Sequence, residues 1–325
     1  MGKKRLQFID VAKGIAILLM IVGHSGISNK ELIHFMFSFH MPLFFIVTGY
    51  FTTKSPFKEI LKKGWIQLLR PYVFTICLVI IFFACLQVSG NLMLHKPYCL
   101  QTFKDLSMGL LTGEGVGPLW FLAALFWAKF FLEIILRFEK YAPALAVLCS
   151  TIAYLLLVNE ISFPWYVLHG MEATIFLYVG TLLRKSRIFS YPMPLINVLV
   201  VSVVVYLSAS TATMAFEKSF PLLMLNVVTA TVISVVVIEN CQILEQYKDK
   251  CFITKYVFAV LNYVGKNTLI ILCFHAVDMY VNFWKYLHIG NFYLFLTLRL
   301  VITCMIPLVI KYIPVFNVVY LKKKI

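Results

Sequence analysis

Apolar stretches long enough to cross a lipid bilayer recur along almost the whole chain. A helix needs about 20 mainly apolar residues to cross roughly 30 Å of hydrocarbon. Of the residues, 61% are hydrophobic and 13% are charged, whereas a soluble domain has about 25% charged residues. We therefore predict an all-α polytopic membrane protein with about ten transmembrane helices, forming one transmembrane domain over residues 1–325 with no soluble domain. The predicted spans are 8–27, 34–52, 69–88, 118–137, 141–158, 166–183, 192–210, 219–239, 258–280 and 292–312.

Two of these spans contain residues that can interrupt a helix. Pro42 lies inside the second span, and Pro164 and Gly170 lie at the start of the sixth. Because proline lacks the backbone N–H that a helix needs, we expect a break near Pro42 and a shortened sixth span. A broken membrane helix is tolerated where it lines a cavity, so the second span is a candidate for such a position.

The basic residues are distributed unevenly between the connecting segments. The net charge is +15, but these residues are scattered between apolar segments, so we expect a bilayer rather than a nucleic acid as the partner. With a cytoplasmic N-terminus, 21 Lys and Arg lie on inside segments, 5 lie outside and three lie within spans. This bias predicts an even number of spans with both termini in the cytoplasm. Asp10 and Lys13 interrupt the first apolar run and no A-x-A-like site follows it, so we expect an uncleaved first helix.

The stretch Phe8–Ser25 combines a membrane-length apolar run with charged and titratable side chains. Lys13 and His24 are eleven residues apart, which returns to nearly the same helix face at about 3.6 residues per turn. They would lie roughly 16 Å apart along the axis, with Lys13 near the cytoplasmic surface and His24 near the outer surface. Because ionisable groups inside a membrane are costly, this stripe is a candidate functional site.

Three further residues each allow a functional and a structural interpretation. His40 lies in an aromatic run and either faces the same cavity as His24 or is a core histidine bonded to a neighbouring helix. Arg70 lies at the cytoplasmic mouth of the third span, where it either anchors the topology or contacts an anionic ligand. Trp120 is either an interfacial belt residue or a substrate platform.

The ninth and tenth spans carry a further set of polar residues. His275 and Asp278 are three apart and therefore share one helix face. Because charges within a membrane usually pair, we expect an ion pair between Asp278 and Arg299. The eight cysteines form no CxxC pair and lie mostly in apolar runs, so we expect packing residues rather than disulfides or a metal site.

Five motifs together resemble the membrane-bound acyltransferase 3 family of transmembrane O-acyltransferases, including its fucose-4-O-acetylase-like group. They are KGIAILLMIVGHS, FHMPLFFIVTGYF, LLRPY, PLWFLAALF and YVGKNTLIILCFH, in the family's order. The similarity extends from about Arg5 to Pro314. It implies transfer of an acyl group, usually acetyl from acetyl-CoA, to hydroxyls of cell-surface glycans or other metabolites. It also implies a multi-pass protein of the bacterial cytoplasmic membrane.

The resemblance also implies roles for particular residues. The family's first helix carries Arg, ten residues and then His; here His24 matches, whereas Lys13 stands at the arginine position. Lysine keeps the charge but lacks the planar fork that binds phosphate bidentately. An Arg-x-x-Arg pair near the third span reads Gln67-x-x-Arg70 here, so only Arg70 is matched. His275 matches a histidine of the last motif, which favours a place in the acceptor cavity.

The expected chemistry is acyl transfer to a hydroxyl, which needs a base to take the hydroxyl proton. We expect His24 to be this base, with Lys13 and Arg70 holding the phosphates of acyl-CoA, which is a donor substrate and not a permanent cofactor. Glu172 and Asp278 are candidate carboxylate partners of His24, because Asp10 lies too far along the helix. His40, Trp120, Glu172, His275 and Asp278 are the candidate cavity residues.

Two other classes of function fit the composition. A secondary transporter or glycan exporter would use intramembrane charges as a substrate or proton path. A non-catalytic acyl-sensing protein would keep the fold. The lack of an internal repeat counts against the transporter, and an intact His24 counts against the sensor.

Overall fold

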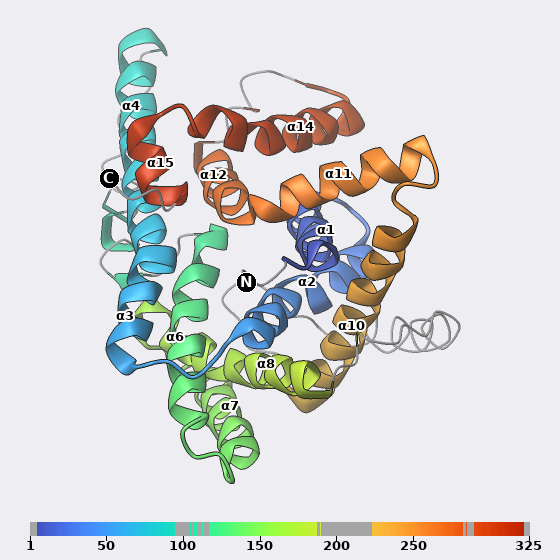
Figure 1. Cartoon of the computed structure of the whole chain (residues 1–325). Helices are drawn as coiled ribbons and strands as arrows, with labels where there is room; N and C mark the ends of the chain where they lie inside the picture. The colour runs from blue at the N-terminus through green and yellow to red at the C-terminus, as the bar shows by residue number, and fades with distance from the viewer. Residues whose placement is uncertain are drawn as a thin grey trace. The chain divides into compact units, whose positions relative to one another are not determined.

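In a computed structural model of the chain, the described residues form helices and the short connections between them, with no strand among them (Figure 1). The described residues are 5–94, 104–105, 107–109, 112–113, 117–186, 189, 223–281, 284 and 289–321. The α-helices are α1 (Gln7–Gly23), α2 (Lys30–Phe51), α3 (Phe57–Gly64), α4 (Arg70–Leu94), α6 (Trp120–Ile135), α7 (Ala142–Val158), α8 (Val167–Ser186), α10 (Leu223–Tyr247), α11 (Phe252–Lys266), α12 (Thr268–Val281), α14 (Phe292–Ile310) and α15 (Pro314–Leu321).

Six helical segments within the described ranges are long and apolar enough to cross a membrane. They are Lys30–Phe51, Phe57–Cys85, Gly117–Ile135, Pro164–Ser186, Met224–Tyr247 and Phe292–Ile310. The number becomes seven if α11 and α12 together make one broken span. Helix α7 is apolar but shorter, and α1 has 17 residues. The all-helical membrane fold is confirmed, whereas the count of ten and the orientation of the termini stay predictions.

Each of nine predicted spans corresponds to at least one helix, and 192–210 lies outside the described residues. The span predicted over 258–280 is two helices, because α11 ends at Lys266 and α12 begins at Thr268. Asn267 ends α11: its backbone N–H donates to Val264 O at 3.0 Å, and its side-chain Nδ2 donates to Tyr263 O at 2.8 Å. These bonds use carbonyls that a helix terminus otherwise leaves without a partner.

The chain forms two compact units, which we describe separately. The first comprises Met1–Lys54, Phe131–Ile161 and Met171–Thr268. The second comprises Ser55–Phe130, Ser162–Gly170 and Leu269–Ile325.

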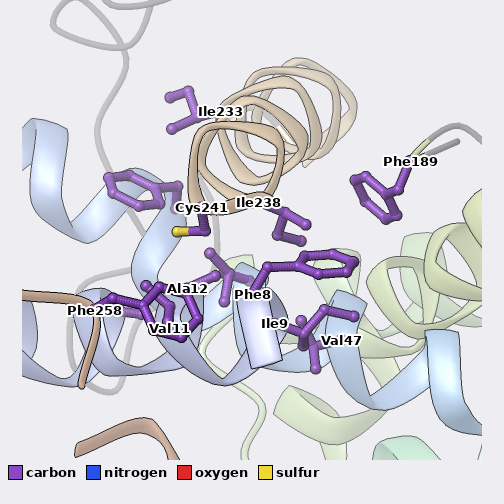
Figure 2. Close-up of a cluster of buried hydrophobic side chains, with 13 residues drawn as sticks. Phe8, Ile9, Val11, Ala12, Val47, Phe189, Ile233, Ile238, Cys241 and Phe258 are labelled. Carbon is purple, nitrogen blue, oxygen red and sulfur yellow. The ribbon is translucent and has the colours of Figure 1, made fainter. Parts of the chain in front are cut away.

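In the first unit, α1 packs against α2, α10 and α11. Their buried apolar side chains form one cluster, which Figure 2 shows around the start of α1. Phe8 lies edge-on to Phe189 at 6.2 Å between ring centroids, and Val11 and Ala12 are fully buried. With α1 enclosed in this way, its polar side chains are held in a defined register.

Glycine permits the closest approach in this unit, between α1 and α11. A Cβ on Gly265 would lie 1.6 Å from Asp10 O, and one on Gly14 would lie 2.3 Å from Leu261 O. No larger residue fits either position unless the helices separate. Small residues at helix interfaces serve this purpose in membrane proteins.

The predicted break at Pro42 is wrong, because α2 is continuous across it. Proline removes one N–H, yet Phe39, Leu43 and Phe45 around it are at most 2% exposed and hold the helix by packing. Contacts with neighbouring helices are one reason why membrane helices tolerate proline.

In the second unit, α3 leads through a π-helical turn, Trp65–Leu69, directly into α4. The Arg70 N–H that ends this turn donates to Trp65 O, five residues back. Single π-turns within helices often mark functional positions.

The sixth span was expected to be shortened at Pro164 and Gly170. It is interrupted at Pro164 but not at Gly170. A short 3-10 turn, Pro164–Tyr166, precedes α8, and it contains Trp165 at φ 61° and Tyr166 at φ 55°. Gly170 lies inside α8, where a Cβ would meet Trp127 Cβ at 2.4 Å. Gly170 therefore permits close packing and does not end the helix.

Candidate active site

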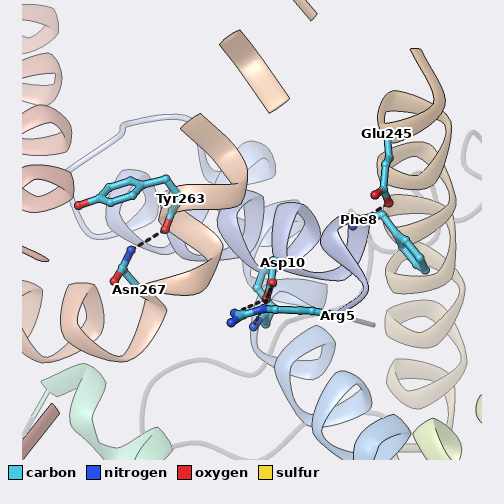
Figure 3. Close-up of polar contacts among 7 residues, drawn as sticks. Arg5, Phe8, Asp10, Glu245, Tyr263 and Asn267 are labelled. Atoms are coloured by element: carbon cyan, nitrogen blue, oxygen red, sulfur yellow. Dashed lines mark hydrogen bonds and ion pairs between the residues drawn. The ribbon is translucent and has the colours of Figure 1, made fainter. Parts of the chain in front are cut away.

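The first site residue, Lys13, belongs to an ion network at the start of α1. Lys13 Nζ lies 2.7 Å from Asp10 Oδ1, and Arg5 Nη2 lies 3.1 Å from the same oxygen. Figure 3 shows Arg5 folded back onto Asp10, and Arg5 Nε also bonds to this carboxylate. Asp10 is 4% exposed, which makes its two cationic partners necessary, because an unpaired buried charge is costly.

The pairing changes what Lys13 can offer to an anion. Asp10 balances one of the two positive charges, so Arg5, Asp10 and Lys13 together carry one net positive charge. The Arg5 side chain is 59% exposed, whereas that of Lys13 is 22% exposed. The hydrogen bond to Asp10 raises the pKa of Arg5 above its ordinary value. Sequence reasoning assigned Arg5 no site role, because its contact with Asp10 requires the chain before α1 to fold back.

His24 lies at the C-cap of α1, immediately after its last helical residue. Its N–H donates to Met20 O at 3.1 Å, and the Ser25 hydroxyl donates to Ile21 O at 2.6 Å. These bonds complete the last turn of α1 and fix the backbone that carries the imidazole. His24 is half-buried and follows the last residue of α1, whereas Lys13 is the seventh of its 17 residues and lies near its middle.

Phe37 of α2 connects His24 with His40. Its ring lies edge-on to His24 at 5.4 Å between centroids and edge-on to His40 at 4.9 Å. His40 is 1% exposed, and its Nδ1 lies 2.8 Å from Met36 O. Because a carbonyl only accepts hydrogen bonds, this contact places a proton on Nδ1, so Nε2 of the neutral ring is an acceptor.

His40 therefore combines features of both interpretations offered by the sequence. It is a buried histidine, but it bonds to its own helix rather than to a neighbouring one, and it shares Phe37 with His24. The structure thus brings His24 and His40 together around one aromatic ring. Glu172 is fully buried on α8 of the same unit, and its role as carboxylate partner of His24 stays a prediction.

In the second unit, Arg70 contacts the last turn of α15. Its Nη2 donates to Val318 O at 2.8 Å and to Val319 O at 3.1 Å. A cation at a helix C-terminus satisfies carbonyls that have no helical partner and interacts favourably with the helix dipole. Arg70 Nε is buried and has no hydrogen-bond partner among the described residues. The Nη2 group of Arg70 therefore holds α15, while its Nε–H is not used in this contact.

Asp278 of α12 is the centre of a buried polar group in this unit. Arg299 Nε donates to Asp278 Oδ2 at 2.6 Å, which confirms the predicted ion pair. Trp284 Nε1 donates to the other carboxylate oxygen, and His275 Nδ1 lies 3.9 Å from Oδ2. His275 is fully buried, and Asp278 and Arg299 are nearly so. Trp284 and Arg299 of the same unit thus supply hydrogen bonds to both carboxylate oxygens of Asp278, which gives this residue a structural role.

Trp120 begins α6 and is buried within an aromatic cluster. It is 4% exposed, and its ring lies 5.9 Å from Tyr166 and 5.8 Å from His169. Trp120 thus packs against aromatic side chains of its own unit, and both interpretations of its role stay predictions. The sequence analysis did not include His169 among the candidate residues. Its position three residues after Tyr166, on the same side of a helix, is the signal that could have placed it in this cluster.

The described residues contain no group of three or more His, Cys, Asp or Glu placed to hold a metal ion. The described cysteines are free, and Cys241 and Cys273 are buried in the packing.

The class of protein follows from these features together with a comparison of the sequence with known protein families. The chain is a multi-pass helical membrane protein with ionisable groups packed among its helices. The sequence model of the acyltransferase domain matches residues 6–313, so the chain belongs to the acyltransferase 3 family and is a membrane acyltransferase. No curated protein and no solved structure gave a significant match.

Proposed function

We propose that this protein is an O-acyltransferase that moves an acyl group, most simply acetyl, from acyl-CoA to a hydroxyl of a sugar, a cell-surface glycan or a related metabolite. The observation that carries this proposal is the family match over 6–313, which includes His24 at the end of α1. The acyl donor and the acceptor are parts of the proposal.

In the proposed reaction, His24 takes the proton from the acceptor hydroxyl while its oxygen attacks the thioester carbonyl. The carbon–sulfur bond then breaks, and His24 returns the proton to the departing coenzyme A thiolate. The imidazole is thus regenerated, and the products are an ester and free thiol. A single positioned base of this kind contributes about 10²–10⁴-fold to a rate.

Arg5, Lys13 and Arg70 are the proposed contacts of the donor phosphates. The network around Asp10 supports this role for the first two, because one positive charge remains after pairing and Arg5 is exposed. Arg70 supports it through its Nε, which its bonds to α15 leave unused. Glu172, His275 and Trp120 remain candidates for the acceptor cavity.

The test is transfer from radiolabelled acetyl-CoA by the purified protein in nanodiscs, offered a mixed pool of sugars and lipid-linked glycans. His24→Ala should reduce transfer by about 10²-fold or more. His34→Ala is the matched control, because His34 lies on α2 and has no assigned role. If wild type neither binds the donor nor transfers label, the proposal fails and a transporter or glycan exporter becomes the better interpretation. Binding without transfer favours a sensor.

A further inference from the structure

Helix α3 presents three different faces along only 8 residues. Ile60 is 7% exposed, and Gly64 lies against Phe126, where a Cβ would come within 2.6 Å of the ring. This face packs on the protein. Phe57 and Leu61, with Trp65 just beyond the helix, are exposed by 40%, 38% and 53%. They recur every four residues and therefore form one adjoining apolar row.

Lysine side chains lie beside this apolar row. Lys58 and Lys62 are four residues apart and exposed, and neither takes part in an ion pair among the described residues. Lys63 lies farther round the helix and pairs with Glu59 at 2.6 Å. An exposed apolar row beside unneutralised lysines is typical of a helix at the boundary between lipid tails and headgroups.

The length of α4 is compatible with this location. Its 25 residues, Arg70–Leu94, extend about 37 Å, whereas the hydrocarbon layer is about 30 Å thick. Helix α4 is therefore long enough to cross that layer by itself, which leaves α3 and the π-helical turn available for the headgroup level.

We propose that Lys58, Lys62 and Trp65 form a binding surface for anionic lipid headgroups. The lysine ammonium groups contact lipid phosphates, while the Trp65 ring sits among the first acyl carbons and fixes the depth of the helix. The surface selects anionic over zwitterionic lipid because only anionic lipid supplies net negative charge to the two lysines. It thereby sets the height of Arg70, one turn farther along, relative to the membrane surface.

The test measures which lipid lies next to Trp65. Full-length protein is placed in nanodiscs containing brominated phosphatidylglycerol or brominated phosphatidylcholine at equal mole fraction. Subtracting the emission of Trp65→Phe isolates the Trp65 signal. We expect stronger quenching by the anionic lipid, by about fivefold in local enrichment per lysine at low salt, and a decline as salt is raised.

The double variant Lys58→Gln/Lys62→Gln should abolish the preference without changing the total quenching at saturating bromolipid. Lys140→Gln/Lys185→Gln, which removes equal charge from two other exposed lysines, should leave the preference intact. Equal quenching of wild type by both lipids, or a preference that survives in the first variant, would overturn the proposal. So would loss of the preference on adding free coenzyme A, since the site would then belong to donor phosphates. None of these results depends on acyl transfer.

Discussion

At the scale of single residues, the pairing of His24 and His40 through Phe37 is the feature with the clearest consequence. The bond to Met36 O fixes the proton of His40 on Nδ1 and directs an acceptor, Nε2, away from its own backbone. Substitution by asparagine or by glutamine can separate the hydrogen bond donated by Nδ1 from the acceptor supplied by Nε2. Asparagine can place an N–H where Nδ1 lies, whereas glutamine can place an oxygen near the position of Nε2.

We expect His40→Gln to retain most acyl transfer and His40→Asn to lose about tenfold, which corresponds to one lost hydrogen bond near the reaction. Transfer rates of the two variants in parallel, with thermal unfolding as the control for folding, check this. If both variants lose activity equally, with an equal loss of stability, His40 acts only in packing.

Arg70 gives a second prediction at this scale. Arg70→Lys keeps the charge but cannot reproduce the Nη2 contacts with both Val318 O and Val319 O. We expect a loss of about 2–3 kcal/mol in unfolding free energy or an equivalent fall in the melting temperature, because hydrogen bonds from charged groups are worth this much. Protease cleavage near α15 should increase at the same time. Unchanged cleavage together with a higher KM for the donor would instead assign Arg70 mainly to phosphate binding.

At the scale of elements, the contact of α1 with α11 depends on glycine. Gly265→Leu would place side-chain atoms where Asp10 O lies, so the helices must separate and the buried network of Asp10 must shift. Overpacking of this kind costs about 1–3 kcal/mol or more. Gly290→Ala is the control, because nothing lies within 4 Å of an added Cβ there. Melting temperatures in detergent measure the difference, and equal values for both variants would contradict the close packing.

The elements also show what sequence could and could not predict. Apolar length predicted where helices lie, because a backbone in lipid must satisfy its own hydrogen bonds. The Asp278–Arg299 pair followed from the cost of unpaired charge. Proline was an uneven guide, since Pro164 precedes a short turn before α8 but α2 continues through Pro42. The break at Asn267 was not predicted, although Lys266 in the last turn and asparagine after it are typical of a helix end.

The candidate site was predicted less completely than the helices. Lys13 lies near the middle of α1 and His24 at its C-cap, and the roles expected from their spacing stay predictions. The contact of Arg5 with Asp10, the bond from Arg70 to α15 and the burial of Trp120 depend on how separate segments pack. Periodicity within one segment contains no information about such contacts.

At the scale of the whole molecule, the predicted orientation can be tested with a native cysteine. Cys251 is exposed before α11, and hydrogen bonds with Thr254 lower the pKa of its thiol. More thiolate is therefore present at neutral pH, and maleimide labelling should level off at a lower pH than for an ordinary thiol. In sealed cells an impermeant maleimide should label Cys251 only after permeabilisation, because the charge bias puts this connection in the cytoplasm.

Thr254→Val removes the hydroxyl bond and should slow this labelling near neutral pH. Buried Cys241 and Cys273 are the internal controls, since they should react only after unfolding. Labelling of Cys251 in intact cells would reverse the predicted orientation of this connection.

The bond between Arg70 and the last turn of α15 links a proposed donor contact to a helix far along the chain. The carbonyls that Arg70 holds belong to Val318 and Val319. A change that displaces this turn therefore moves a residue proposed to contact the donor, although the change itself touches no reacting group. Weaker donor binding in such a variant would report on the position of α15.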